Sequence, residues 1–215
     1  MLPFTIIDEP ARLSAHQSYQ QPCQVSNTTD PEARLPGDIA MWFVIMMELT
    51  VFALFFIGFA VMKRLEPQMF ADGQGIIHIS IGLACTISLL ISSYFVALAL
   101  DAAKCGDNPK VGKQLIASLC FAFIYLMAKS YEYSLLINAG FSLSTNDFFT
   151  LYYLITAFHF MHVVLGCGIL FYLYKQSRKH FYSTNENQGF EAAATYWHMV
   201  DLVWILVFFL IYIAH

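Results

Sequence analysis

The sequence has little charge for its length, and this scarcity excludes whole classes of protein. Only 12% of its 215 residues are charged, whereas 58% are hydrophobic and 16% are aromatic. Soluble domains usually carry about 25% charged residues. The net charge of −4 also offers no basic surface for nucleic acid. We therefore expect a membrane protein that does not bind nucleic acid.

Motifs for common catalytic and cofactor chemistry are also missing. The five cysteines include no CxxC or CxxxC pair, so we expect neither a zinc site nor a disulfide. The sequence has no glycine-rich phosphate loop and no Gly-x-Ser-x-Gly nucleophile motif. Residues 1–36 contain five prolines and no apolar core of the kind that a signal peptide needs. We expect this segment to be a polar N-terminal tail.

What the sequence does have is five apolar runs, each with roughly the ~20 residues that a transmembrane helix needs. Turn-forming and charged residues separate the runs. We therefore predict an all-α, polytopic membrane domain over residues 37–215, built as a bundle of five transmembrane helices. The runs cover approximately residues 39–62, 76–100, 112–137, 147–174 and 191–213.

Lysine and arginine are distributed unevenly between the two sides of this bundle. Eight of the 11 lie on the side of the N-terminus, two lie on the opposite side, and Lys129 lies inside a helix. Short loops rich in lysine and arginine remain in the cytoplasm of the cell. The pattern therefore predicts that the N-terminus is cytoplasmic.

Ionisable side chains inside the apolar runs are the candidate functional residues, because charge is costly in lipid. Lys129 and Glu132 are three residues apart and can form an ion pair along their helix, with little need for another partner. His198 and Asp201 have the same spacing and can pair with each other or with polar groups on neighbouring helices. We expect a buried structural network of hydrogen bonds. Its predicted members are Lys129, Glu132, His159, His162, His198 and Asp201.

Glu48 is the best single candidate for a functional role. It has no acid or base within four residues on its helix, so we expect a protonated carboxyl group. This group either donates a hydrogen bond to a backbone carbonyl or takes part in proton handling or in binding a lipid or a partner.

A metal centre is an alternative interpretation of the histidines. His159 and His162 share one helix face, as ligands of helical-bundle metal sites do, but the di-iron pattern also needs Glu-x-x-His, which is absent. We therefore expect no metal in this chain. A free-standing membrane metalloenzyme and a proton channel remain alternatives.

Four motifs resemble the subunit III family of haem-copper oxidases. FHFMHVVLGCGIL at residues 158–170 is similar to the family's FHG-L-H-V-x-x-G helix. GFEAAATYWHMVDLVWILVFFLIY at residues 189–212 is similar to its GFEA…YWHFVDVVW terminus. KSYEYSLL at residues 129–136 and MMELTVFALFF at residues 46–56 resemble two further helices of the family. The chain resembles the short, five-helix bacterial form. The stretch PGDIAMWFVIMMELTVFALFF at residues 36–56 resembles the subgroup associated with nitric-oxide reductases.

The resemblance implies a non-catalytic subunit that holds no cofactor itself and supports assembly, lipid binding and proton uptake. Haem and copper are expected in the partner subunits I and II, and the location is expected to be a bacterial inner membrane. A cytochrome c oxidase is the first choice of complex, and a quinol oxidase or nitric-oxide reductase is the second. Glu48 falls on a family carboxylate associated with proton uptake or lipid contacts, and Lys129 replaces the usual glutamine. The family positions regarded as architectural are Glu132, His159, His162, His198 and Asp201.

Overall fold

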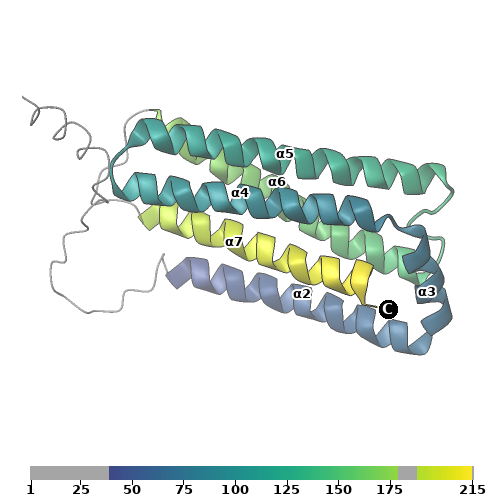
Figure 1. The fold of residues 1–215 in the computed structure, drawn as a ribbon. Helices are drawn as coiled ribbons and strands as arrows, with labels where there is room; N and C mark the ends of the chain where they lie inside the picture. The colour runs from purple at the N-terminus through teal and green to yellow at the C-terminus, as the bar shows by residue number, and fades with distance from the viewer. Residues whose placement is uncertain (1–38, 179–187, 215) are drawn as a thin grey trace, which may run out of the picture. The chain divides into compact units, whose positions relative to one another are not determined.

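The structure is a computed structural model that describes residues 39–178 and 188–214. These residues are helical and contain no strand. Five helices are long and apolar enough to cross a membrane, which confirms the predicted all-α bundle. The predicted tail, residues 1–36, lies outside the described residues. The elements, labelled as in Figure 1, are α2 (Ile39–Leu65), α3 (Pro67–Ile76), α4 (Ile79–Lys104), α5 (Asn108–Asn138), α6 (Asp147–Ser177), α7 (Gln188–Phe208) and the π-helical turn η1 (Phe209–Ile213).

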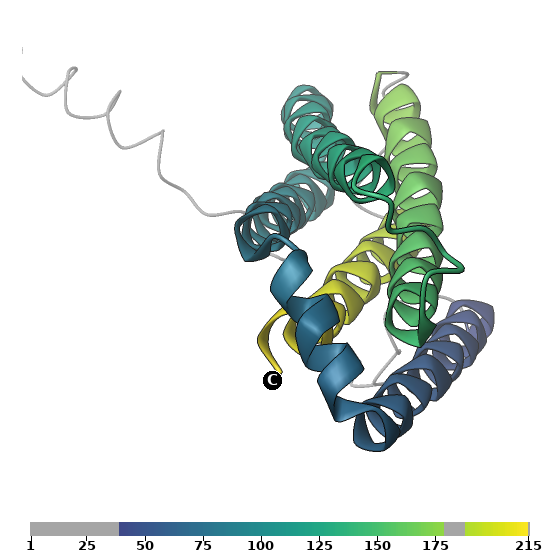
Figure 2. The same ribbon diagram turned by 90° about the vertical axis from the view of Figure 1, so that its right-hand side faces the viewer.

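The short helix α3 differs from the prediction, which treated residues 65–75 as a break. Pro67 lies in its first turn, where a proline is tolerated because its missing N–H would have no helical partner. Gly73 packs so closely on Phe148 of α6 that an added Cβ would lie 2.2 Å from the ring. Proline and glycine, which predicted a break, are therefore compatible with a helix here. This helix crosses the end of the bundle between α2 and α4 (Figures 1 and 2).

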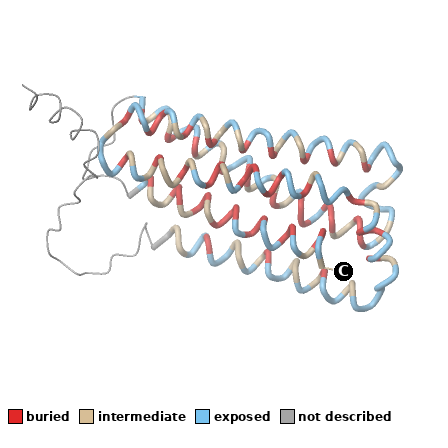
Figure 3. The backbone as a smooth tube through the Cα atoms, in the orientation of Figure 1, coloured by how far each residue is buried: buried red, intermediate tan, exposed pale blue. Residues whose placement is uncertain are grey.

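The last helix, α7, is the most buried of the five spans. In its most apolar stretch 61% of the residues are buried, compared with 17% in α2. It packs against α2, α4 and α6, whereas α5 packs mainly against α4 and α6 (Figure 2). Figure 3 shows buried positions recurring along α7. Polar side chains on α7 therefore face protein rather than lipid.

Small side chains hold neighbouring helices close together. On α4, Ser88 donates a hydrogen bond to a carbonyl oxygen of α5 at 2.6 Å, and Ser92 donates to the carbonyl oxygen of Ser118 at 3.0 Å. Between α6 and α7, Gly166 leaves room for the ring of Trp197, which would lie 2.7 Å from a Cβ at that position. Lipid supplies no hydrophobic drive for helix association, so contacts of this kind stabilise the bundle.

The outer surface of the bundle is strongly apolar. Phe43 on α2 is 74% exposed, Phe123 on α5 is 60% exposed and Leu202 on α7 is 61% exposed. A soluble monomer rarely exposes apolar patches of the size that such residues form together. The surface therefore agrees with a membrane-spanning bundle.

The connection between α4 and α5 contains a capped helix start. The Asp107 side chain accepts a hydrogen bond from the backbone N–H of Lys110 at 3.2 Å, and the Lys110 ammonium lies 2.7 Å from the same carboxylate. The hydrogen bond from the Lys110 side chain lowers the pKa of the Asp107 carboxyl, which favours the charged form of this carboxyl at the helix N-terminus. Cys105 in this connection is disulfide-bonded, so the expectation of no disulfide is wrong.

Candidate functional site

Glu48 on α2 lies opposite His162 on α6, and we call these two residues the rim pair. The Glu48 Oε2 is 2.9 Å from His162 Nε2, and the Nδ1 of the same ring is 2.8 Å from the carbonyl oxygen of Phe158. A carbonyl oxygen only accepts, so Nδ1 carries a hydrogen. The short contact at Nε2 then needs one further proton between the imidazole and the carboxylate. The pair has no net charge wherever that proton resides.

For Glu48 we expected either a hydrogen bond to a backbone carbonyl or a role in proton handling or in binding a lipid or a partner. In the structure its hydrogen-bond partner is an imidazole and not a backbone carbonyl. Its partner lies 114 residues later in the sequence, so no spacing within one helix reveals it. The Glu48 side chain is 19% exposed and the His162 side chain is 11% exposed. The ring of Phe158 packs on the imidazole with 4.6 Å between centroids. The pair therefore lies at the edge of the bundle, with aromatic cover on one side.

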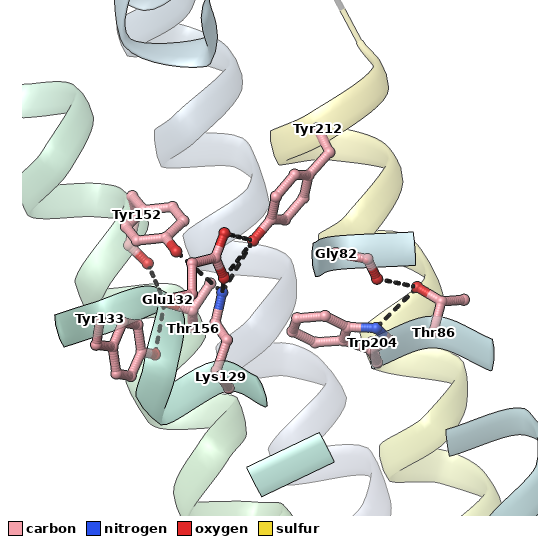
Figure 4. Close-up of polar contacts among 9 residues, drawn as sticks. All are labelled: Gly82, Thr86, Lys129, Glu132, Tyr133, Tyr152, Thr156, Trp204 and Tyr212. Carbon is pink, nitrogen blue, oxygen red and sulfur yellow. Dashed lines mark hydrogen bonds and ion pairs between the residues drawn. The ribbon is translucent and has the colours of Figure 1, made fainter. Parts of the chain in front are cut away.

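A second acid–base pair, Lys129 and Glu132 on α5, lies in the interior, and we call it the inner pair. The Lys129 Nζ is 2.7 Å from Glu132 Oε2, and the two side chains are 0% and 1% exposed. The i, i+3 spacing predicts this contact. Two tyrosines complete the group, Tyr152 on α6 and Tyr212 on η1 (Figure 4).

Each proton of the Lys129 ammonium group has a hydrogen-bond acceptor. The Lys129 Nζ carries three protons and contacts Glu132 and the hydroxyls of the two tyrosines at 2.7, 3.0 and 3.0 Å. The Tyr212 hydroxyl lies 2.8 and 2.9 Å from the two carboxylate oxygens of Glu132 and donates to them. A buried ion pair is tolerated only when such hydrogen bonds are made. The expectation that this pair has little need for another partner is therefore wrong, because tyrosines from α6 and η1 contact it.

Trp204 of α7 lies beside Lys129 of the inner pair (Figure 4). The Lys129 Nζ lies 5.4 Å from the centroid of its ring, which is within the range of a cation–π contact. The indole N–H donates to Thr86 Oγ1 on α4 at 3.0 Å, and this hydroxyl donates in turn to the carbonyl oxygen of Gly82 at 2.9 Å. The indole ring is thus held by hydrogen bonds as well as by packing.

His159 joins neither pair. It is fully buried, and neither ring nitrogen has a hydrogen-bond partner within the described part of the chain. Its ring packs against those of Trp204, Tyr125 and Phe52, with centroid distances of 5.1, 5.9 and 6.3 Å. Phe52 also packs on His162, at 5.5 Å. His159 therefore belongs to an aromatic core between the rim pair and the inner pair.

His198 and Asp201 on α7 are not hydrogen-bonded to each other. The His198 Nδ1 lies 2.6 Å from the hydroxyl of Ser93 on α4, and Asp201 Oδ1 is buried without a partner. Of the two options that the spacing left open, His198 therefore has the second, a polar group on a neighbouring helix, because α4 packs on α7 here and supplies a hydroxyl group. The structure thus divides the predicted network into separate groups on different helix pairs.

Two side chains that the sequence analysis did not consider hold the end of the chain. Gln74 of α3 donates hydrogen bonds to the carbonyl oxygens of Ile211 and Ala214 at 2.9 and 2.8 Å, and Lys63 of α2 also donates to Ala214. The last carbonyl groups of a helix have no partner within it, so these bonds satisfy them. They also hold η1 where Tyr212 reaches the inner pair.

Among the residues that the structure describes, no group of three or more His, Cys, Asp or Glu side chains is placed to hold a metal ion. His159 and His162, which the sequence placed on one helix face, have different surroundings, one in the aromatic core and one against Glu48. The rim pair can share a proton, and the inner pair can hold two opposite charges next to each other in the interior.

Comparison with known proteins gives a family match over most of the chain. A family described as "Cytochrome c oxidase subunit III" matches residues 37–215. The chain is similar to "Cytochrome c oxidase subunit 3" of Synechocystis sp., with 29% identity over 184 residues, which are 85% of this chain and 76% of that protein.

Relatives from animals and plants carry the same description. The protein of Lumbricus terrestris is 32% identical over 133 residues, which are 62% of this chain and 50% of the relative. The protein of Triticum aestivum is 35% identical over 138 residues, which are 61% of this chain and 49% of the relative. The matched part thus spans about half the length of these two relatives.

Proposed function

Because the chain belongs to the cytochrome c oxidase subunit III family, we propose that it is a non-catalytic transmembrane subunit of a haem-copper respiratory oxidase. Membership of this family implies association with other subunits of such an oxidase. The match over residues 37–215, which contains all five described spans, carries the proposal. Subunits I and II would hold the haem and copper in a bacterial inner membrane, and the N-terminus of this chain would lie in the cytoplasm.

The rim pair supports a role in proton uptake as part of this proposal. Glu48 and His162 share one proton, and its movement between them creates no net charge in the membrane. Both side chains are partly exposed, so a neighbouring subunit can contact them and exchange a proton with them. In the proposed complex the rim pair accepts a proton and passes it toward the catalytic subunit.

The apolar outer surface supports two further parts of the proposal, assembly with partner helices and binding of phospholipids. Large hydrophobic side chains are exposed on every long helix of the described bundle. Such a surface needs apolar partners, which in a membrane are lipid chains or other helices.

Purification of the tagged chain in a mild detergent tests the proposal. We expect haem-containing polypeptides to co-purify with it and to give a haem absorption spectrum. Recovery of the chain without haem, from membranes whose haem-copper oxidase elutes separately, would contradict the proposal. Bound iron or copper in the chain freed of its partners would instead favour a metalloenzyme, and proton conductance in liposomes would favour a channel.

A nitric-oxide reductase or a quinol oxidase is a second candidate for the complex, because the stretch at residues 36–56 resembles the subgroup found with nitric-oxide reductases. The same purified complex distinguishes the candidates. Oxygen consumption with reduced cytochrome c indicates the first, oxygen consumption with a quinol indicates a quinol oxidase, and consumption of nitric oxide indicates a reductase.

A further inference from the structure

Two adjoining hollows lie along the seam between α5 and α6, at the end where α5 begins and α6 ends. The first measures about 410 Å³, and Lys113 and Arg178 are among its lining residues. The second measures about 380 Å³ and is lined mainly by apolar and aromatic side chains such as Phe123. Ile116 and Tyr174 line both hollows, which therefore form one continuous groove. We call it the α5–α6 groove.

The groove is about as long as one leaflet of a membrane is thick. Lys113 and Ile124 are 11 residues apart on α5, which corresponds to about 16 Å along a helix. Half of the hydrocarbon core of a bilayer is about 15 Å thick. Because α5 and α6 each have 31 residues, they extend beyond the hydrocarbon. The charged end of the groove then reaches the head groups, and its apolar end lies among the acyl chains.

The charged end of the groove is electrically positive. Neither Lys113 nor Arg178 belongs to any of the four ion pairs formed within residues 41–178 and 189–214. Asp107, the acid nearest to Lys113 in sequence, already binds Lys110 at 2.7 Å. An arginine and a lysine in this position suit a phosphate group, which arginine can contact with two parallel hydrogen bonds.

We infer that the α5–α6 groove binds one anionic glycerophospholipid as a specific part of the folded protein. The phosphate lies between Lys113 and Arg178, and one acyl chain lies along Ile116 and Phe123. A partner helix would fill the apolar part of the groove but would have to bring an acid to the two cations. A lipid supplies the negative head group and the apolar chain in one molecule, at the spacing of this groove.

This inference rests on the lipid-binding part of the proposed function, and it is tested on the isolated full-length chain so that the two can fail separately. The chain in detergent is titrated with dioleoyl phosphatidylglycerol or, as the neutral reference, dioleoyl phosphatidylcholine, and bound lipid is counted by native mass spectrometry. We expect one molecule of phosphatidylglycerol to bind at lower concentration than phosphatidylcholine.

Removal of the two charges should weaken this binding. We expect Lys113→Gln and Arg178→Gln each to raise the concentration for half-occupancy about fivefold, and the double variant about thirtyfold. Lys104→Gln is the matched control, because Lys104 lies at the same end of the bundle on α4 and pairs with Glu191 at 3.3 Å. It should leave lipid binding unchanged.

A second variant fills the groove without changing its charge. Ile116 is 44% exposed at the junction of the two hollows, so Ile116→Trp should block the acyl chain while the bundle remains folded. Ile87→Trp is the control, at a position on α4 that is 49% exposed and outside the groove. We expect the first variant to lose the tightly bound lipid and the second to keep it.

Three results would overturn the inference. One is equal binding of the two lipids by the unmodified chain, and another is unchanged binding in the double charge variant. The third is an Ile116→Trp chain that keeps its lipid but no longer co-purifies with haem-containing subunits, which would make the groove a protein interface. A chain that binds the lipid specifically but never co-purifies with haem would count against the oxidase role alone.

Discussion

Glu48 and Glu132 are both carboxylates inside membrane-spanning helices, but the bundle surrounds them differently. Glu132 is 1% exposed and is contacted by the ammonium of Lys129 and the hydroxyl of Tyr212. Glu48 is 19% exposed and is contacted by the imidazole of His162. In the inner pair, Glu132 thus contacts an ammonium group and a tyrosine hydroxyl, whereas in the rim pair Glu48 has one described partner, an imidazole.

This difference shows that an acid inside a membrane protein is not by itself a sign of function. In the inner pair, transfer of a proton from Lys129 to Glu132 would remove the two charges with which the tyrosine hydroxyls form hydrogen bonds. The inner pair is therefore suited to holding α5, α6 and η1 together. In the rim pair, one proton is shared near the surface, and its transfer disturbs no other hydrogen bond of Glu48 in the described contacts. The number of fixed partners therefore separates a structural carboxylate from a candidate for proton transfer.

The largest effect is expected from removal of the cation of the inner pair. Lys129→Met leaves the Glu132 carboxylate buried without its counter-ion, which should lower the free energy of unfolding by about 3–5 kcal/mol. Reversible unfolding of the purified chain in mixed micelles with increasing dodecyl sulfate measures this loss. The double variant Lys129→Met/Glu132→Leu is the control and should be more stable than the single variant. If Lys129→Met were as stable as the unmodified chain, the inner pair would not be more important for stability than the rim pair.

A smaller loss is expected from the hydroxyl that joins both members of the inner pair. Tyr212→Phe removes a donor to Glu132 and an acceptor for Lys129, so the free energy of unfolding should fall by about 2 kcal/mol. Tyr152→Phe, which removes only the contact to Lys129, should cost less in the same unfolding assay. The reverse order would mean that the Tyr212 contacts do not hold η1 in place.

Removal of the partner in the rim pair should cost little stability. His162→Leu removes one hydrogen bond from Glu48 at a partly exposed position, and we expect a loss of about 1 kcal/mol or less. The measurement is the same unfolding experiment. A loss comparable with that of Lys129→Met would show that the rim pair is as structural as the inner pair.

The smallest effect on stability, and the clearest effect on function, is expected from Glu48→Gln. The amide can still donate to His162 Nε2, so the free energy of unfolding should change by about 0.5 kcal/mol or less. In the assembled complex, however, proton uptake should slow or activity should decay during turnover, because the amide cannot release a proton. Oxygen consumption over many turnovers measures this.

The exposed acid Glu66 provides the matched control for that experiment, as Glu66→Gln removes a carboxylate that lies outside both pairs. Its kinetics should equal those of the unmodified complex. Unchanged kinetics over many turnovers in Glu48→Gln as well would argue against a proton role for the rim pair.

The fold could be predicted largely from local features of the sequence, with errors where distant contacts intervene. Five apolar runs predicted five spans, since length and hydrophobicity are properties of each segment alone. Helix α3 was missed because Pro67 and Gly73 usually mark turns. Their role as a helix start and as a contact surface for Phe148 depends on how α3 and α6 meet.

The candidate residues show the same limit. The contact between Lys129 and Glu132 follows from their spacing on one helix, whereas Tyr212 lies 80 residues from Glu132 and was not connected with it. His198 had an acid at the same spacing but contacts a hydroxyl of α4 instead. Spacing gives the possible partners on one helix and cannot rank them against side chains from its neighbours.

The sequence alone determined that the chain is a membrane protein, that its described part contains five helices able to span a membrane, and that Lys129 and Glu132 share a helix face. These follow from hydrophobicity and from the 3.6-residue turn of the α-helix, which are local. Only the tertiary structure decided that His162 meets Glu48, that two tyrosines enclose the inner pair, and that α5 and α6 form a groove. These depend on the rotation and depth of each helix against its neighbours, which close packing of many weak contacts sets across the whole bundle.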